Sequence, residues 1–170
     1  KYASNSFLAT KISYMNQISQ FCSIVGANID DVRKGMGPDP DIAPGYLYAG
    51  CGFGGSCLPK DVRSLIHQAG EKGKDFSILK AVSKVNEDQK KYLFSIASSI
   101  FNNNFLDKKI AIWGLSFKPN TDDMRGAPSL TLIQNLLESG AFVECYDPVV
   151  SDNRQSFEIQ HNSLKIGLDS

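Results

Sequence analysis

Two short apolar runs with a helical pattern between them place the strongest constraint on the fold of this chain. Residues Lys109–Trp113 read KIAIW and residues Phe142–Tyr146 read FVECY, and both runs are typical of short buried strands. Pro128 and Ser129 start the helical pattern between them, and Gly140 ends it. A strand, a helix and a second strand in this order predict a βαβ unit with parallel strands. Because two parallel strands cannot bury themselves, we expect the rest of the sheet beyond residue 150 or outside this chain.

The chain before these strands has a helical pattern. Apolar residues recur at helical spacing over residues 7–25, where we expect Leu8, Ile12, Met15, Ile18, Cys22 and Val25 to be buried. Gly26 is suited to end that helix, and a short second helix follows. Further helices are predicted over residues 59–69 and 77–101. The expected buried side of the last helix is Leu79, Val82, Val85, Leu93, Ile96 and Ile100. The class is therefore α/β, with a helical domain over residues 1–105 and a parallel α/β domain over residues 106–170.

The composition argues against several classes of partner and site. The chain has 18 Lys and Arg against 18 Asp and Glu, so no broad basic surface is available and we expect no nucleic-acid partner. No apolar run approaches the roughly 20 residues of a membrane span, so no membrane partner is expected either. The four cysteines lack a C-x-x-C pair and only two histidines accompany them, which predicts no metal site and no disulfide framework. Four reduced thiols indicate a cytoplasmic protein.

The strongest chemical motif is GFGGSCLPKD at residues 52–61. Its glycines let the backbone approach a ligand closely. Cys57 lies at the start of the helix that Pro59 opens, where free N–H groups and the positive helix end favour a thiolate. Lys60 adds a positive charge, and Asp61 is four residues from Cys57 on the same helix face. This set predicts an activated nucleophile with a carboxylate beside it. The alternative is that Cys57 is a small buried residue, which is how we interpret the other three cysteines.

Two further segments carry polar groups in patterns that suit ligand binding. Lys1 and Asn5 are four residues apart on one side of the first helix, where both can donate hydrogen bonds to an oxyanion. Residues 117–125 follow the first strand at its carboxyl end, where open α/β sheets bind ligands, and Lys118 and Arg125 there suit a phosphate. The alternatives are a solvated helix face for the first segment and an ordinary polar loop for the second.

The segments KYASNSFLATKISYMNQ, GFGGSCLPKDV and GLSFKPNTDDMR occur together and in this order. On these motifs the chain resembles the UDP-glucose/GDP-mannose dehydrogenase family, over nearly all residues to about 150. The resemblance implies that residues 1–105 are an all-helical central dimerisation domain. It implies that residues 106–170 are an incomplete Rossmann-like domain that binds a UDP-sugar. It also implies a homodimer through the central helices.

The resemblance also implies a role for individual residues. Cys57 matches the catalytic nucleophile, Lys1 and Asn5 match the oxyanion-stabilising pair, and Asp61 matches the carboxylate that assists proton transfer and hydrolysis. The residues matching the family's substrate contacts are Tyr46, Leu47, Tyr48, Phe53, Gly54, Phe117 and Lys118. Arg125 matches a residue near the dinucleotide.

The implied reaction is oxidation of the C6 alcohol of a nucleotide sugar to a uronic acid, with two hydride transfers to NAD as cofactor. Cys57 would capture the aldehyde as a thiohemiacetal, and water would hydrolyse the later thioester. No G-x-G-x-x-G follows any strand of this sequence, so the main NAD-binding domain is expected outside it. We therefore expect the chain to be part of a longer polypeptide and to be inactive on its own.

Three alternatives stay open. The substrate can be GDP-mannose instead of UDP-glucose, although FKPNTDDMRGAPSL followed by YDP favours the UDP-glucose members. The chain can be a non-catalytic helical dimerisation module, which the two long amphipathic helices would support. A redox-switch thiol is the third alternative, with Cys51 as the near partner of Cys57.

Overall fold

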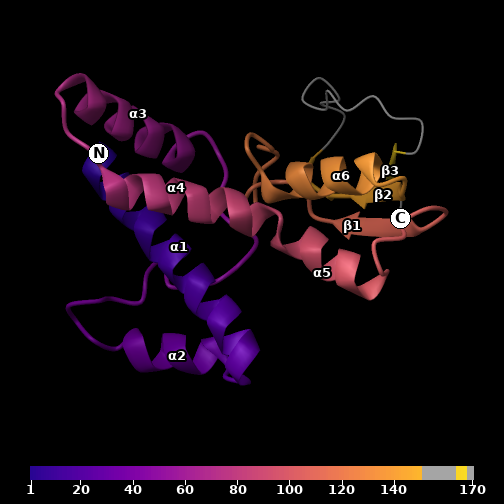
Figure 1. Cartoon of the computed structure of the whole chain (residues 1–170), viewed down its shortest axis with the longest axis horizontal. Helices are drawn as coiled ribbons and strands as arrows, with labels where there is room; N and C mark the ends of the chain where they lie inside the picture. The colour runs from indigo at the N-terminus through magenta and orange to yellow at the C-terminus, as the bar shows by residue number, and fades with distance from the viewer. Residues whose placement is uncertain (151–163, 168–170) are drawn as a thin grey trace. The chain divides into compact units, whose positions relative to one another are not determined.

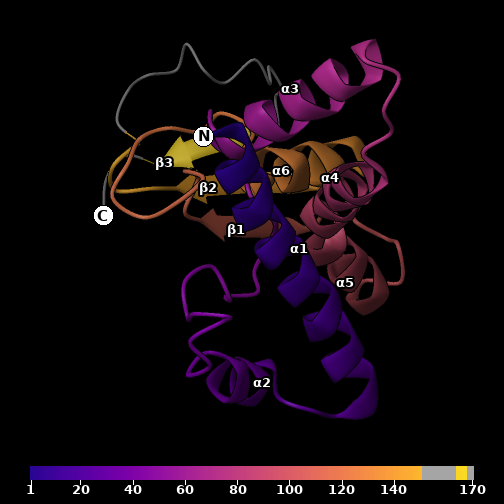
Figure 2. The ribbon, with the colours of Figure 1, turned by 90° about the vertical axis from the view of Figure 1, so that its left-hand side faces the viewer.

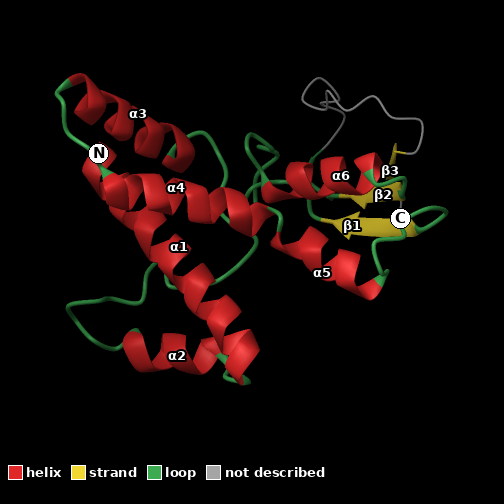
Figure 3. Cartoon of the chain, in the orientation of Figure 1, coloured by secondary structure: helices red, strands yellow, loops and turns green. Residues whose placement is uncertain are grey.

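The computed structural model describes residues 1–150 and 164–167. The described residues divide into two compact units (Figure 1). Residues 1–52 and 57–89 form the first unit, and residues 53–56 join the second unit with the chain from residue 90 onward. In Figure 3 the strands occur only in the second unit, and the first is built of helices and loops. The structure confirms the predicted α/β class, with an all-helical part followed by an incomplete parallel α/β part.

The first unit is organised around the long helix α1 (Tyr2–Val25). Gly26 ends α1 with a left-handed φ of 73°, as the sequence predicts. Helix α2 (Ile29–Met36) starts at Asn28, whose side chain accepts a hydrogen bond from the N–H of Asp30. Helix α3 (Leu58–Glu71) packs against α1, and α4 (Ser77–Lys90) completes the unit. In Figure 2 the amino-terminal half of α1 lies beside α3, and α2 lies near its other end.

The buried face of α1 differs from the one predicted. Met15 and Cys22 are buried, but Val25 is exposed. Small and polar residues fill much of the buried face, namely Ser6, Ala9, Ser13 and Asn16. Apolar periodicity alone does not identify such a face, because close approach of helices favours short side chains over large apolar ones.

The predicted helix over residues 77–101 is wrong as one element. The chain forms α4 and then α5 (Tyr92–Ile100), with Lys91 between them outside both helices. Leu79 and Val82 are buried, as predicted for α4. On α5, however, the residues predicted as buried are exposed, and other residues pack on the core of the second unit. The exposed residues are Leu93, Ile96 and Ile100, and the packed ones are Phe94, Ala97 and Phe101. The break therefore separates α4 residues that are buried in the first unit from α5 residues that pack on the core of the second unit.

The second unit is a three-stranded parallel sheet with α6 (Pro128–Glu138) packed against it. The strands are β1 (Lys109–Trp113), β2 (Phe142–Tyr146) and β3 (Leu164–Gly167), in that spatial order. In register, Lys109 pairs with Phe142 and Val143 pairs with Leu164. The parallel pairing and the expectation of more sheet beyond residue 150 are thus confirmed.

One face of this sheet forms a core with the helices. That core contains Ile112, Leu115, Ile133, Leu136, Leu137, Val143 and Cys145, with Phe105 stacked on Phe94. Residues on the alternate positions of the strands are exposed, and Trp113 at the end of β1 has 85% of its surface accessible. Among the described residues, no helix is both long and apolar enough to cross a membrane.

Candidate active site

In the first unit, the start of α1 meets the first turn of α3 at a buried carboxylate. Asp61 is fully buried. Its Oδ2 accepts a 2.6 Å hydrogen bond from Nδ2 of Asn5, and its Oδ1 accepts a 2.7 Å bond from Nζ of Lys60. Both carboxylate oxygens are therefore satisfied by donors, as a buried carboxylate requires.

These donors keep Asp61 ionised. The hydrogen bond from Lys60 is the main cause that lowers the pKa of Asp61, burial opposes it, and the Asn5 amide and the charge of Lys1 lower it further. The same bond raises the pKa of Lys60. The site therefore holds a fixed negative charge between positive groups at neutral pH. Lys60 was noted in the sequence only as an added charge, and its direct bond to Asp61 is a feature that the motif does not reveal.

Cys57 lies at the amino-terminal end of α3, immediately before its first residue. The residue is exposed, unlike the buried Cys22 and Cys145. Its carbonyl oxygen accepts the 2.9 Å hydrogen bond from the N–H of Asp61 that closes the first turn. A negative charge on Cys57 also raises the pKa of Lys60, so these two groups lie within electrostatic reach. The helix end and a cation are the two features that favour a thiolate.

The four predicted catalytic residues therefore all lie at two adjoining helix starts. Lys1 caps α1, and its charge acts on Asp61. Asn5 bonds to Asp61 directly. Cys57 and Asp61 frame the first turn of α3. The two helix starts thus bring a thiol, an amine, an amide and an ionised carboxylate into one part of the first unit.

The predicted substrate loop at residues 46–48 belongs to the same unit. Tyr46 and Tyr48 are exposed, and the guanidinium carbon of Arg33 lies 4.5 Å from the centre of the Tyr48 ring. The Leu47 side chain is only 2% exposed, so this residue can offer a ligand its backbone but not its side chain. Cys51 is exposed, which differs from the structural role that we expected for it.

In the second unit, the glycine segment at residues 53–56 packs closely on the loop before α6. The N–H of Gly55 donates a 2.7 Å hydrogen bond to the carbonyl of Arg125. A Cβ atom at Gly54 would clash with the carbonyl oxygen of Gly126. At Gly55, φ is 79° and a Cβ would lie 2.7 Å from the ring of Phe117. Only glycine meets both requirements, for close approach and for left-handed backbone.

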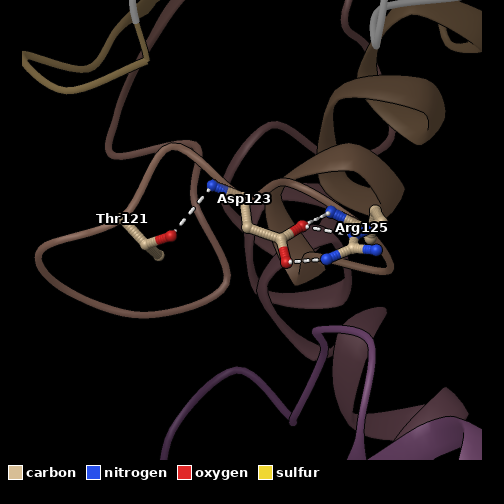
Figure 4. A network of polar contacts seen from close by, with 3 residues as sticks. All are labelled: Thr121, Asp123 and Arg125. Carbon is tan, nitrogen blue, oxygen red and sulfur yellow. Dashed lines mark hydrogen bonds and ion pairs between the residues drawn. The ribbon is translucent and has the colours of Figure 1, made fainter.

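The Arg125 side chain is held by Asp123 in a two-pronged ion pair (Figure 4). Nε and Nη2 of Arg125 donate to the two oxygens of Asp123 at 2.9 and 2.7 Å, and the backbone N–H of Arg125 adds a 2.9 Å bond. These bonds lower the pKa of Asp123 to about 2. Asp123 was not predicted as a site residue, although its position two residues before Arg125 allowed such a pair. Lys118 is exposed, and its Nζ lies 5.4 Å from the centre of the Phe117 ring.

A second carboxylate, Asp147, organises the loops at the carboxyl ends of β1 and β2. Its Oδ2 accepts from the N–H groups of Leu115 and Ser116 at 2.7 and 3.2 Å. Its Oδ1 accepts from the N–H groups of Val149 and Val150 at 2.9 and 3.1 Å. Burial raises the pKa of Asp147, but these four bonds outweigh it and hold the pKa at about 2. The sequence signal was the YDP that follows the second strand, which we did not interpret as a site.

The described residues do not fit a dinucleotide site of their own. Gly50 to Gly55 match the letters G-x-G-x-x-G, but irregular chain precedes them where the fingerprint needs a strand. The loop after β1 begins at Gly114 and lacks the further glycines of that motif. Within the described part of the chain, no cluster of three or more His, Cys, Asp and Glu side chains is arranged to hold a metal ion.

Comparisons with known proteins agree with this division of the chain. Residues 1–88 match the model of the UDP-glucose/GDP-mannose dehydrogenase family, central domain, and residues 111–167 match that family's UDP binding domain. The UDP-glucose 6-dehydrogenase of Pseudomonas aeruginosa is 50% identical over 151 residues, which are 89% of this chain and 33% of that protein. UDP-glucose 6-dehydrogenase YwqF of Bacillus subtilis is 50% identical over 149 residues, 88% of this chain and 34% of that protein.

Solved structures give the same result. A UDP-glucose dehydrogenase from the archaeon Pyrobaculum islandicum has a TM-score of 0.92 at 35% identity, over 99% of this chain and 38% of that one. A GDP-mannose dehydrogenase from Pseudomonas aeruginosa has a TM-score of 0.59 at 30% identity, over 95% of this chain and 36% of that one. The chain thus spans about a third of the length of the curated relatives it matches. With both family models matched in order along it, the chain belongs to the UDP-glucose/GDP-mannose dehydrogenase family.

Proposed function

We propose that the whole protein is an NAD-dependent UDP-glucose 6-dehydrogenase, which oxidises the C6 alcohol of UDP-glucose to the carboxylate of UDP-glucuronate. The observation that carries the proposal is the hydrogen bond between Asn5 and Asp61, which joins the two helix starts that bear the four candidate catalytic residues. UDP-glucose, in preference to GDP-mannose, is supported by the names of the relatives at 50% identity.

In this proposal NAD, when it is bound, accepts the hydride. The residues of this chain hold the sugar carbon and stabilise the charge that develops on its oxygen. The Cys57 thiolate adds to the C6 aldehyde and retains it as a thiohemiacetal, so that the carbon keeps a hydride to lose in the second oxidation. Lys1 and Asn5 donate hydrogen bonds to the oxygen of each tetrahedral stage. Removal of one such donor typically costs about 100-fold or more in turnover.

Asp61 is suited to guide the proton and water steps. Its carboxylate is ionised and buried, and it orients both Lys60 and Asn5. When water attacks the thioester carbon, the carbon–sulfur bond breaks, the thiol of Cys57 is restored and the uronate leaves. An ionised carboxylate beside cationic groups supports transfer of the proton from that water through this network.

The candidate substrate contacts fall into two sets. Tyr46 and Tyr48, with the backbone of Leu47, form one set in the first unit, and Phe53, Gly54, Phe117 and Lys118 form the other in the second unit. Lys118 carries an exposed positive charge that suits a phosphate of the nucleotide. Arg125 stays a proposal as a contact to the dinucleotide, with its orientation set by Asp123.

We also propose a homodimer formed through α1. Its outward surface carries Phe7, Tyr14 and Phe21, which are exposed and spaced by seven residues. Residues at this spacing lie on one side of a helix and suit a helix from a second copy. This partner role is compatible with catalysis. A cytoplasmic location is supported by the four free cysteines.

The test is replacement of Cys57 by Ser in the whole protein. Uronate formation should fall below detection, while Cys51→Ser, which changes the other exposed cysteine, should keep normal turnover. Product is measured as UDP-glucuronate by mass spectrometry, with GDP-mannose run in parallel. Undiminished uronate formation by the Cys57→Ser protein would refute the proposed function.

A further inference from the structure

A single residue, Gly50, is held through both its N–H and its C=O group by buried side-chain amides. The N–H of Gly50 donates a 2.8 Å hydrogen bond to Oδ1 of Asn16 on α1. The carbonyl of Gly50 accepts a 2.7 Å bond from Nε2 of Gln89 on α4. The two amides are 34 and 39 residues away from Gly50 in sequence, so the fold brings them together on one loop residue.

A third amide sets the orientation of Gln89. Nε2 of Gln20 donates a 2.6 Å hydrogen bond to Oε1 of Gln89, which leaves Nε2 of Gln89 to face Gly50. The bonds therefore run in one direction, from Gln20 to Gln89, to Gly50, and to Asn16. The two bonds of the Gln89 amide can strengthen each other, because one amide group accepts the first and donates the second.

These amides are poorly explained as packing between helices. Asn16 and Gln89 are 0% and 4% exposed, and a buried amide is costly unless its groups are paired. Nδ2 of Asn16 has no hydrogen-bond partner in the part of the chain that the structure describes. An apolar side chain would serve packing at lower cost, so the useful group of Asn16 is its acceptor oxygen on Gly50.

Gly50 is an exposed residue at the start of the short loop that leads to Cys57. Between these two residues the backbone turns through Gly52 and Gly55, which have φ of 100° and 79°, and it forms no regular helix or strand. A segment of this kind has no hydrogen-bond ladder of its own, so its conformation depends on where it is attached. At one end Cys57 directly precedes α3, at the other the two amides hold Gly50, and between them the N–H of Gly55 bonds to the carbonyl of Arg125. The amides thus provide the attachment that lies on the Gly50 side of the loop.

We infer that Asn16 and Gln89 are positioning residues, which hold the backbone on both sides of the Gly50 Cα so that Cys57 is presented in its reactive geometry. This inference rests on the proposed function of Cys57. The amides touch neither the sulfur nor a substrate in this scheme, and they act through the loop. Misplacement of a reacting group by about 1 Å is enough to cost up to about 100-fold in rate.

The test uses the whole protein with Gln89→Met, which keeps the side-chain length and removes both polar groups. The matched control is Ser13→Ala. Oγ of Ser13 donates a 3.2 Å hydrogen bond to the carbonyl of Val82, so it also joins α1 to α4 in a buried place, but it does not touch the loop. Folding is checked for each variant by circular dichroism and thermal melting.

The expected result is a fall in kcat of about tenfold or more for Gln89→Met, with KM for UDP-glucose changed by less than about threefold. Ser13→Ala should keep kcat even if its melting temperature falls. In a Cys51→Ser background, the rate of Cys57 alkylation by iodoacetamide should change by about threefold or more in Gln89→Met and stay the same in Ser13→Ala. Hydrogen exchange at the Gly50 amide should become about tenfold faster.

The inference is overturned if folded Gln89→Met keeps both its kcat and its Cys57 alkylation rate, or if Ser13→Ala alters them equally. If Gln89→Met does not fold, Asn16→Ala provides the same comparison, because it removes only the acceptor of the Gly50 N–H. The alkylation and exchange measurements need no turnover. They therefore test the positioning role even if Cys57→Ser retains uronate formation and the proposed function fails.

Discussion

Asn5 and Asp61 are 56 residues apart in sequence, and the 2.6 Å hydrogen bond from the Asn5 amide to the Asp61 carboxylate ties the beginning of α1 to the first turn of α3. Each residue thereby fixes the other. An ionised Asp61 serves both donors best, since protonation would put a hydrogen on one of the two oxygens that Asn5 and Lys60 contact.

Replacement of Asp61 by Asn tests this dependence. An amide at this position places an N–H₂ group against either Lys60, which can only donate, or the N–H₂ group of Asn5. Either a bond is lost or the Asn5 amide turns over, and both outcomes disturb the present arrangement of donors. We expect kcat to fall by about 100-fold or more. Asp88→Asn is the control, because Asp88 pairs with Lys84 on the exposed surface. Steady-state kinetics with UDP-glucose measures the effect, and near-normal kcat in Asp61→Asn would contradict the proposed role.

The pH dependence of stability follows from Asp147. Its folded pKa of about 2 lies below the ordinary value of about 3.9, so it stabilises the folded state fully above pH 4. This contribution should be lost as the pH falls from about 4 towards 2. Asp147→Asn removes the charge and leaves fewer acceptors for four N–H groups, at a cost of about 1–3 kcal/mol at pH 7.

Urea unfolding at pH 7 and pH 3 measures this effect. The difference in unfolding free energy between the unchanged protein and Asp147→Asn should shrink at the lower pH. Asp122→Asn, at an exposed position, should change stability little at either pH. An Asp147→Asn protein as stable as the parent at pH 7 would show that the carboxylate does not organise the loops.

The contact between Gly54 and Gly126 predicts a steric effect. Gly54→Ala would press a Cβ against the Gly126 carbonyl, whose carbon is 2.8 Å from the position of that atom. The atoms that the new Cβ would meet belong to the backbone, so the clash can be relieved only if the loop moves. We therefore expect the free energy of unfolding to fall by about 1–3 kcal/mol. Gly45→Ala is the matched control, since nothing lies within 4 Å of a Cβ there. Calorimetric melting of the two variants should show a lower transition only for Gly54→Ala.

The exposed stripe on α1 predicts the oligomeric state. Phe21→Glu puts a charge into the proposed apolar contact, which should convert the dimer to a monomer. Light scattering after size-exclusion chromatography gives the mass directly. Trp113→Glu alters a more exposed aromatic residue on β1 and should leave the mass unchanged. A Phe21→Glu protein that stays dimeric would exclude this face of α1 as the interface.

Local patterns in the sequence were enough to predict the α/β part. The bounds of β1 and β2 agree with the apolar runs, and α6 starts at Pro128 as expected. In each case the residues that carry the sequence pattern are the same few residues that form the strand or start the helix. The start of α3 at Leu58, directly after Cys57, was also predictable, because Pro59 suits the first turn of a helix.

Features that depend on distant residues were not predictable. The break at Lys91 has no Gly or Pro to mark it, and it reflects which core each side of the helix packs on. Two local contacts were missed for another reason: the ion pair of Asp123 with Arg125 and the bond of Lys60 to Asp61 join neighbours that look like ordinary surface charges in sequence. Asn16 and Gln89 are polar residues on helices, and the apolar pattern of the sequence does not identify them as buried. Only the fold shows that both bind Gly50.

The exposure of Trp113 determines what optical measurements can report. It is the only tryptophan in the sequence and it ends β1, so indole fluorescence follows the sheet and its loops. With 85% of its surface in water, it should emit at long wavelength already in the native state. Unfolding of either unit would then shift this emission little, so a melting curve recorded by tryptophan emission would underestimate both transitions.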